Sequence, residues 1–158
     1  MTEPLPPASR RVAEGARLLG LEIEIDRFPQ GTRTAADAAA AIGCDVSAIV
    51  KSLVFMVDDR PVVALVPGDR RVDPVALAEA MNGSGARRAS LEEARAATGY
   101  AAGGTPPFGH TEQLPVVADP SLRRHDVVWA AGGTPDTVVP IDPMKLAEAA
   151  GAIWAPVS

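Results

Sequence analysis

Apolar residues occur along the chain in short runs whose spacing predicts both strands and helices. Residues 49–57 and 61–66 are nearly continuous apolar runs separated by Asp58-Asp59-Arg60, which is typical of two antiparallel core strands joined by a tight turn. Over residues 21–26 apolar and acidic side chains alternate, so we expect a strand with one solvated face. Further strands are predicted over 114–118, 126–131, 137–141 and 153–157.

Helices are predicted where a capping residue precedes a periodic apolar run. Ser90-Leu91-Glu92-Glu93 matches the capping box, and Thr34 precedes an alanine-rich run that ends at Gly43. Helices and strands are mixed without strict strand–helix–strand alternation, so we expect an α+β fold with helices around a mixed, curved, largely antiparallel sheet. The ranges expected to be helical are 9–20, 35–42, 74–81, 90–98 and 143–150.

Length and composition indicate one domain over residues 1–158, because the chain is 47% hydrophobic but too short for two full-sized domains. The apolar runs are too short for a membrane span and no signal-peptide pattern is present, so we expect a cytoplasmic protein. The single cysteine, Cys44, and two histidines offer no spacing for structural zinc. We therefore expect no metal site.

The net charge of −5 and the pI near 5.0 argue against a broad nucleic-acid footprint. Six aromatic residues are too few for a platform that stacks many bases, so the protein would hold at most a nucleic-acid end. Three arginine pairs are local basic candidates, although each pair is also compatible with ordinary solvated surface. They are Arg70-Arg71, Arg87-Arg88 and Arg123-Arg124.

Lys51 is unusual because its ammonium group interrupts the apolar run over residues 48–55. Two interpretations are open. On a solvated strand face the lysine has no special role, and the pattern alone favours this reading. In a cleft it would be a point charge for a phosphate or a developing oxyanion.

Residues 99–110 form a loop rich in glycine and proline that ends at His110, and its hexapeptide Ala-Ala-Gly-Gly-Thr-Pro, residues 101–106, recurs at residues 130–135. Paired glycines let a backbone or a ligand approach closely. Backbone N–H groups at Gly104 or Gly109 could face an ester carbonyl, as in an oxyanion hole, but a structural loop is equally compatible. His110 is either a base, a group that orients a ligand, or a hydrogen-bonded structural residue.

No pattern identifies a nucleophile. Gly-x-Ser-x-Gly is absent, Ser52 has no base beside it in the sequence, and Cys44 is most simply a small apolar residue. Covalent catalysis is therefore disfavoured, which argues against an esterase of small molecules.

Several of these segments occur together in one order. They are Arg33-Thr34-Ala35, the run from Ile49 to Phe55 with Lys51-Ser52 inside it, the loop Gly103 to His110, and Ala131-Gly132-Gly133. In order and approximate spacing they resemble the YbaK/prolyl-tRNA synthetase-associated domain family. The resemblance covers nearly the whole chain.

This resemblance implies a mixed-sheet α+β fold around a small pocket, and hydrolysis of the ester between a wrong amino acid and the 3′ end of a tRNA, commonly tRNA for proline. By position, Lys51 matches the family lysine that holds the tRNA end or the ester and is the expected catalytic residue. Aminoacyl-tRNA is the expected partner, with prolyl-tRNA synthetase or another synthetase as a second, and no cofactor is implied. The residues expected to bind substrate are Thr34, Ser52, Gly103, Gly104, Pro107, Phe108, Gly109, His110, Gly132 and Gly133.

An aminoacyl ester is already activated, so a positioned water, an electrostatic clamp and the ribose hydroxyl can suffice for its hydrolysis. Which of these groups leads the chemistry stays open. Ser52 follows the lysine where relatives that act on alanine tend to have asparagine, so serine, threonine, cysteine and alanine all remain candidate substrates. The alternative function is a non-catalytic module that binds tRNA ends or a synthetase.

Overall fold

The computed structural model describes residues 5–28 and 34–158, so Arg33 lies outside the described residues. Within these ranges no helix is both long and apolar enough to cross a membrane. The helices are α1 (Pro7–Leu18), α2 (Ala35–Ile42), α3 (Pro74–Ala80), α4 (Leu91–Thr98) and α5 (Pro143–Ala150), with 3-10 turns η1 (Val46–Ala48) and η2 (Pro120–Arg124). The predicted caps are confirmed: Thr34 Oγ1 accepts from the Asp37 amide, and Ser90 and Glu93 form the capping box.

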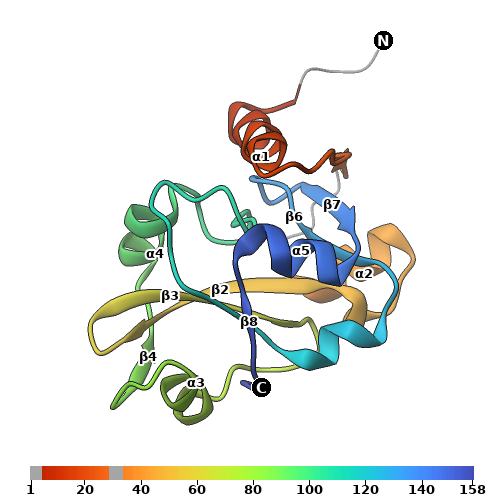
Figure 1. Ribbon diagram of the computed structural model, residues 1–158. Coiled ribbons are helices and arrows are strands. Elements are labelled where there is room, and N and C mark those ends of the chain that lie inside the picture. The colour runs from red at the N-terminus through yellow and green to blue at the C-terminus, as the bar shows by residue number, and fades with distance from the viewer. Residues whose placement is uncertain (1–4, 29–33) are drawn as a thin grey trace.

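A five-stranded sheet is built on the predicted hairpin (Figure 1). Strands β2 (Val50–Val57) and β3 (Arg60–Pro67) are antiparallel, and Asp58 and Asp59 make the turn with φ of 49° and 64°. The other strands are β4 (Ala86–Arg88), β5 (Val116–Ala118) and β8 (Ile153–Trp154), in the order β4-β2-β3-β5-β8. Because β5 pairs parallel with β3 and with β8, the sheet is mixed, as expected.

A second, three-stranded sheet has the order β1-β7-β6 and is antiparallel throughout. Its strands are β1 (Asp26–Arg27), β6 (Val128–Ala131) and β7 (Thr137–Ile141). A parallel bridge between Ile49 and Trp129 links it to the start of β2. The α+β class is thus confirmed, but the strands divide between two sheets that meet at this bridge.

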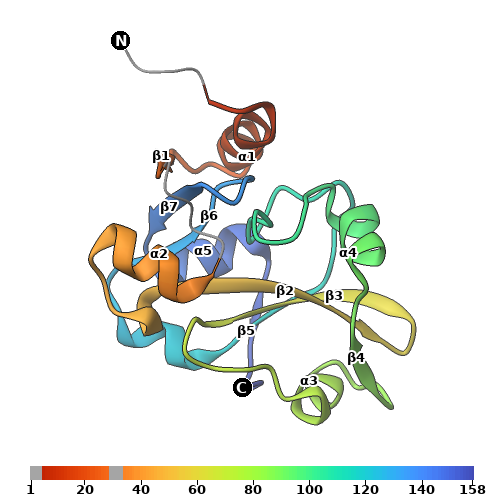
Figure 2. The same cartoon turned by 180° about the vertical axis from the view of Figure 1, so that it is seen from behind.

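Helices pack on both faces of the β2–β3 hairpin. Figures 1 and 2 show α1 beside β6 and β7, and α3 on the far side of the hairpin. Val12 of α1 belongs to the buried cluster that contains Val50 and Val54, whereas Leu77 of α3 packs in the cluster of Phe55. Alternate residues of β2 therefore face two different cores.

One strand prediction needs correction, and one strand was missed. Residues 21–25 have no strand pairing, and only Asp26 and Arg27 join a sheet. The alternation is nonetheless real, because Leu21, Ile23 and Ile25 pack against the core while their acidic neighbours are exposed or half-buried. Periodicity reports burial, and burial does not require a partner strand. Conversely, β4 was not predicted, because three residues with two exposed arginines show no apolar pattern.

Candidate active site

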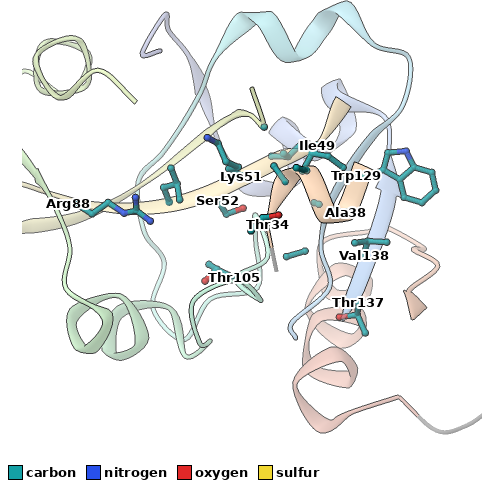
Figure 3. A pocket seen from close by; sticks show the side chains of 18 residues that line it. Thr34, Ala38, Ile49, Lys51, Ser52, Arg88, Thr105, Trp129, Thr137 and Val138 are labelled. Atoms are coloured by element: carbon teal, nitrogen blue, oxygen red, sulfur yellow. The ribbon is translucent and has the colours of Figure 1, made fainter. Parts of the chain in front are cut away.

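A cavity of about 480 Å³ lies where the two sheets meet (Figure 3). Its walls come from the start of α2, the first half of β2, the end of β4, the loop after α4, and strands β6 and β7. The lining residues are Thr34, Ala35, Ala36, Ala38, Ile49, Val50, Lys51, Ser52, Leu53, Gly68, Arg88, Gly103, Thr105, Trp129, Ala130, Ala131, Thr137 and Val138.

The first half of β2 presents an open edge to this cavity, since among the described residues no strand pairs with it on the side away from β3. β4 pairs with β2 only from Phe55 onward, and β6 touches it at Ile49. The Ala89 amide donates to the Val54 carbonyl on the β4 side, whereas the Ile49 carbonyl accepts from Gly68 on the β3 side. Because peptide groups alternate along a strand, the N–H and C=O of Ser52 point away from β3, toward the open edge.

Lys51 and Ser52 extend to opposite sides of β2 (Figure 3). The Lys51 ammonium donates to the Arg70 carbonyl and is half-buried. Burial lowers the pKa of Lys51, and the positive charges of Arg88 and Arg71 lower it further, whereas Asp69 opposes them. Cations gathered at the rim of a cavity make a local anion site on an otherwise acidic protein.

Hydroxyl groups line the other side of the strand. The Ser52 Oγ is buried and has no hydrogen-bond partner within the described residues. Thr34 is occupied as the cap of α2, and Thr105 Oγ1 donates weakly, over 3.4 Å, to the Ala101 carbonyl. A buried hydroxyl without a partner is costly, so Ser52 is a group that a ligand could satisfy after rotation about χ1.

The two glycine corners of the repeated hexapeptide touch each other. Gly103, with φ of 84°, lines the cavity, and a Cβ at Gly104 would lie 2.8 Å from the Gly133 carbonyl oxygen. Gly132 and Gly133 are not among the described lining residues. They pack instead against Thr137 and the start of α1, so that Ala130 and Ala131 form the wall that the sequence assigned to these glycines.

The end of the long loop lies elsewhere. Pro107 and Phe108 are buried, and Phe108 is a core residue with 3% of its surface exposed. His110 Nε2 is 2.7 Å from the Pro106 carbonyl, and burial lowers the pKa of His110 although this hydrogen bond opposes the shift. Phe108, Gly109 and His110 line a separate hollow beside α1. These contacts favour the interpretation of His110 as a hydrogen-bonded structural residue.

The predicted residues Lys51, Ser52, Thr34 and Gly103 thus meet at one cavity. Sequence reasoning did not place Arg88 there, since its position depends on how β4 pairs with β2. Thr105 was also missing from the predicted site residues, although its position between the glycines and prolines of the loop over residues 99–110 could have indicated it. Across residues 5–28 and 34–158 no three His, Cys, Asp or Glu side chains are grouped as metal ligands would be.

Comparison with known proteins identifies the family of this chain and a similar structure. The family sequence model described as the aminoacyl-tRNA editing domain matches residues 29–149 of this chain. A crystal structure of a proposed trans-editing enzyme for prolyl-tRNA synthetase superposes with a TM-score of 0.92 and 38% identity, covering 98% of this chain and 99% of the other.

Two of the curated relatives illustrate what the chain is similar to. The proposed Cys-tRNA(Pro)/Cys-tRNA(Cys) deacylase EbsC of Enterococcus faecalis is 29% identical over 101 residues, which are 63% of this chain and 62% of that protein. The proline–tRNA ligase of Nitratidesulfovibrio vulgaris is 33% identical over 102 residues, 65% of this chain. The match spans only 18% of the ligase.

Proposed function

Because this chain belongs to the aminoacyl-tRNA editing domain family, we propose that it is a deacylase that hydrolyses the ester between a wrong amino acid and the 3′ end of a tRNA. The observation that carries the proposal is the cavity at the open edge of β2, with the Lys51 ammonium on one side of the strand and hydroxyl groups on the other. This division suits a ligand with a phosphate at one end and a small aminoacyl group at the other.

Lys51 is the central residue of the cationic side. Its ammonium is tethered by the Arg70 carbonyl, and Arg71 and Arg88 add positive potential around it. A compact, positioned ammonium is suited to hold a phosphate oxygen of the terminal nucleotide or the polarised ester. The lysine would therefore act by fixing the ester in place.

The aminoacyl group would lie on the side of Ser52, Thr34 and Thr105. The cavity wall there is built largely of alanine and β-branched side chains, and steric clash with it would set the largest aminoacyl side chain that fits. Serine, threonine, cysteine and alanine fit this limit. The unpartnered Ser52 hydroxyl supports an amino acid that can hydrogen-bond to it.

Hydrolysis needs no nucleophile from the protein. A water oxygen bonds to the ester carbonyl carbon, the bond from that carbon to the ribose oxygen breaks, and the ribose oxygen receives the proton that the water loses. The Ser52 N–H on the open edge is available to stabilise the charge that develops on the carbonyl oxygen. The neighbouring ribose hydroxyl can orient the water.

The acidity of the chain bears on its partners. With a net charge of −5, it would grip little more than the tRNA end, and the remaining affinity would come from a synthetase that holds the same tRNA. Prolyl-tRNA synthetase is the proposed partner, in line with the structural relative described as its trans-editing enzyme. The cytoplasm, where charged tRNA is used, is the proposed compartment.

The test is a panel of tRNAs for proline charged with serine, threonine, cysteine or alanine. We expect the protein to release at least one amino acid, and Lys51→Ala to lower the rate by about 100-fold because a positioned electrostatic group is lost. The matched control is Lys145→Ala, which removes the other lysine, exposed on α5. Binding without release of any amino acid would support the non-catalytic module instead. A Lys51→Ala protein as active as the control would remove the lysine from the mechanism.

A further inference from the structure

A second hollow, of about 730 Å³, lies between the end of α1, the end of α5 and the loop after Phe108. Its lining is largely apolar, including Phe108, Leu114 and Val116. At its edge Leu18 is 74% exposed and Leu19 is 48% exposed. Adjacent leucines that face water beside an apolar hollow are a feature of protein-docking sites.

The hollow also has a negative rim. Glu112 and Glu148 are exposed at its edge, and neither forms an ion pair with another described residue. Both α1 and α5 end at the hollow, at Leu18 and Ala150, so the partial negative charge of two helix C-termini is added there.

Two of the positive groups nearby make contacts within the chain, whereas Lys145, one turn before Glu148 on α5, is exposed. Arg11 lies over the Tyr100 ring at 4.9 Å and donates to the Gly99 carbonyl, and Arg17 pairs with Glu14. His110 adds little charge near neutral pH, because burial lowers its pKa below the ordinary value. Among the residues that line the hollow, Glu14, Glu112 and Glu148 outnumber Arg11, so the lining is net negative, which repels nucleic acid and attracts a cationic polypeptide.

We propose that this hollow docks a short basic amphipathic segment of a protein partner, with apolar side chains against Leu18 and Leu19 and Lys or Arg side chains beside Glu112 and Glu148. A partner that binds RNA exposes segments rich in Lys and Arg, which match this description. The site is separate from the cavity but shares one loop with it, since Gly103 and Thr105 face the cavity while Phe108 and Gly109 face the hollow. A partner in the hollow therefore leaves the cavity free for the tRNA end.

The experiment measures binding of a labelled synthetic helical peptide with leucines on one face and lysines on the other. A peptide with glutamates in place of the lysines is the charge control. We expect the basic peptide to bind the intact protein, and the glutamate peptide to bind at least ten-fold more weakly. Leu18→Ser and the double variant Glu112→Lys/Glu148→Lys should each weaken binding of the basic peptide by ten-fold or more.

Matched variants on α4 separate this site from general attraction to an acidic protein. Leu91 is 74% exposed, like Leu18, and Glu92 is exposed on the same helix. We expect Leu91→Ser and Glu92→Lys to bind the peptide as the parent protein does. Equal weakening by the α4 variants, absence of binding, or a chain dimer in sedimentation that Leu18→Ser dissociates would each overturn the proposal. Deacylation of charged tRNA, measured in the same variants, reports on the cavity independently.

Discussion

The hexapeptide Ala-Ala-Gly-Gly-Thr-Pro occurs twice in the chain, and its two copies have different surroundings. In the first copy, residues 101–106, Gly103 is exposed at the cavity and Thr105 lines it. In the second copy, residues 130–135, Gly133 packs against the backbone at the start of α1, where a Cβ would lie 2.8 Å from the Ala8 carbonyl oxygen. The first copy borders the site, and the second joins elements of the fold.

Hydrogen bonds follow the same division. Thr134 Oγ1 donates to the Asp136 carboxylate at 2.6 Å and lies 2.8 Å from Thr137 Oγ1, within a network that reaches Ser9 of α1. Thr105 makes one long bond within its own loop. Identical local sequences therefore acquire different roles from their neighbours. Because Gly104 rests on Gly133, the wall of the cavity depends on the scaffold behind it.

The largest expected effect is that of Gly133→Ala. The added Cβ would collide with the backbone of Ala8 and Ser9 at 2.8–3.0 Å, and φ is 106°, so we expect the free energy of unfolding to fall by about 3 kcal/mol. Urea denaturation measures this change in the free energy of unfolding. The matched control is Gly20→Ala, where φ is 82° but nothing lies within 4 Å of the Cβ, and the expected loss is about 1 kcal/mol. Equal losses would mean that the contact with α1 contributes nothing.

Gly104→Ala tests the contact between the two copies. Its Cβ would lie 2.8 Å from the Gly133 oxygen and from Thr134 Cα, both backbone atoms, so we expect a loss of about 2 kcal/mol in unfolding free energy. Release of amino acid from charged tRNA should fall as well, since the cavity wall is displaced. Gly85→Ala, which meets nothing within 4 Å, is the control for both measurements. A Gly104→Ala protein that behaves like it would show that the corners are independent.

The two threonines form a matched pair. Thr134→Val removes a hydrogen bond to a carboxylate and should lower the free energy of unfolding by about 1.5 kcal/mol, while deacylation by the folded protein changes little. Thr105→Val should reverse the pattern, with stability nearly unchanged and deacylation reduced. Thermal unfolding and single-turnover hydrolysis measure the two quantities. If both variants lose mainly stability, the division of roles between the copies is wrong.

The smallest effect is a pH dependence. The Thr134 hydroxyl, and to a smaller degree Arg27, lower the pKa of Asp136, against the opposing effect of partial burial. A carboxyl whose folded pKa is lowered adds stability above its unfolded pKa, and loses it as pH falls through the folded value. Asp136→Asn should therefore reduce the loss of stability between pH 5 and lower pH, measured by urea unfolding. If the free energy of unfolding of Asp136→Asn fell with decreasing pH as steeply as that of the parent protein, the hydrogen bond from Thr134 to Asp136 would be contradicted.

Much of the fold followed from local sequence. The hairpin of β2 and β3 and the caps at Thr34 and Ser90 were predicted correctly, because apolar runs, turns and caps act over a few residues. The strand expected over 21–26 was largely wrong, and β4 was missed. In both cases the pairing depends on a distant segment, which periodicity does not report.

The candidate site divides in the same way. The sequence by itself determined that Lys51 and Ser52 stand on adjacent positions of a core strand, and that two identical glycine corners exist. Only the tertiary structure decided that β2 has an open edge there, that Arg88 joins the lysine, and that one corner borders the cavity while the other packs on α1. The physical reason is that side-chain alternation is a property of one strand, whereas an open edge and a close backbone contact are properties of several segments brought together.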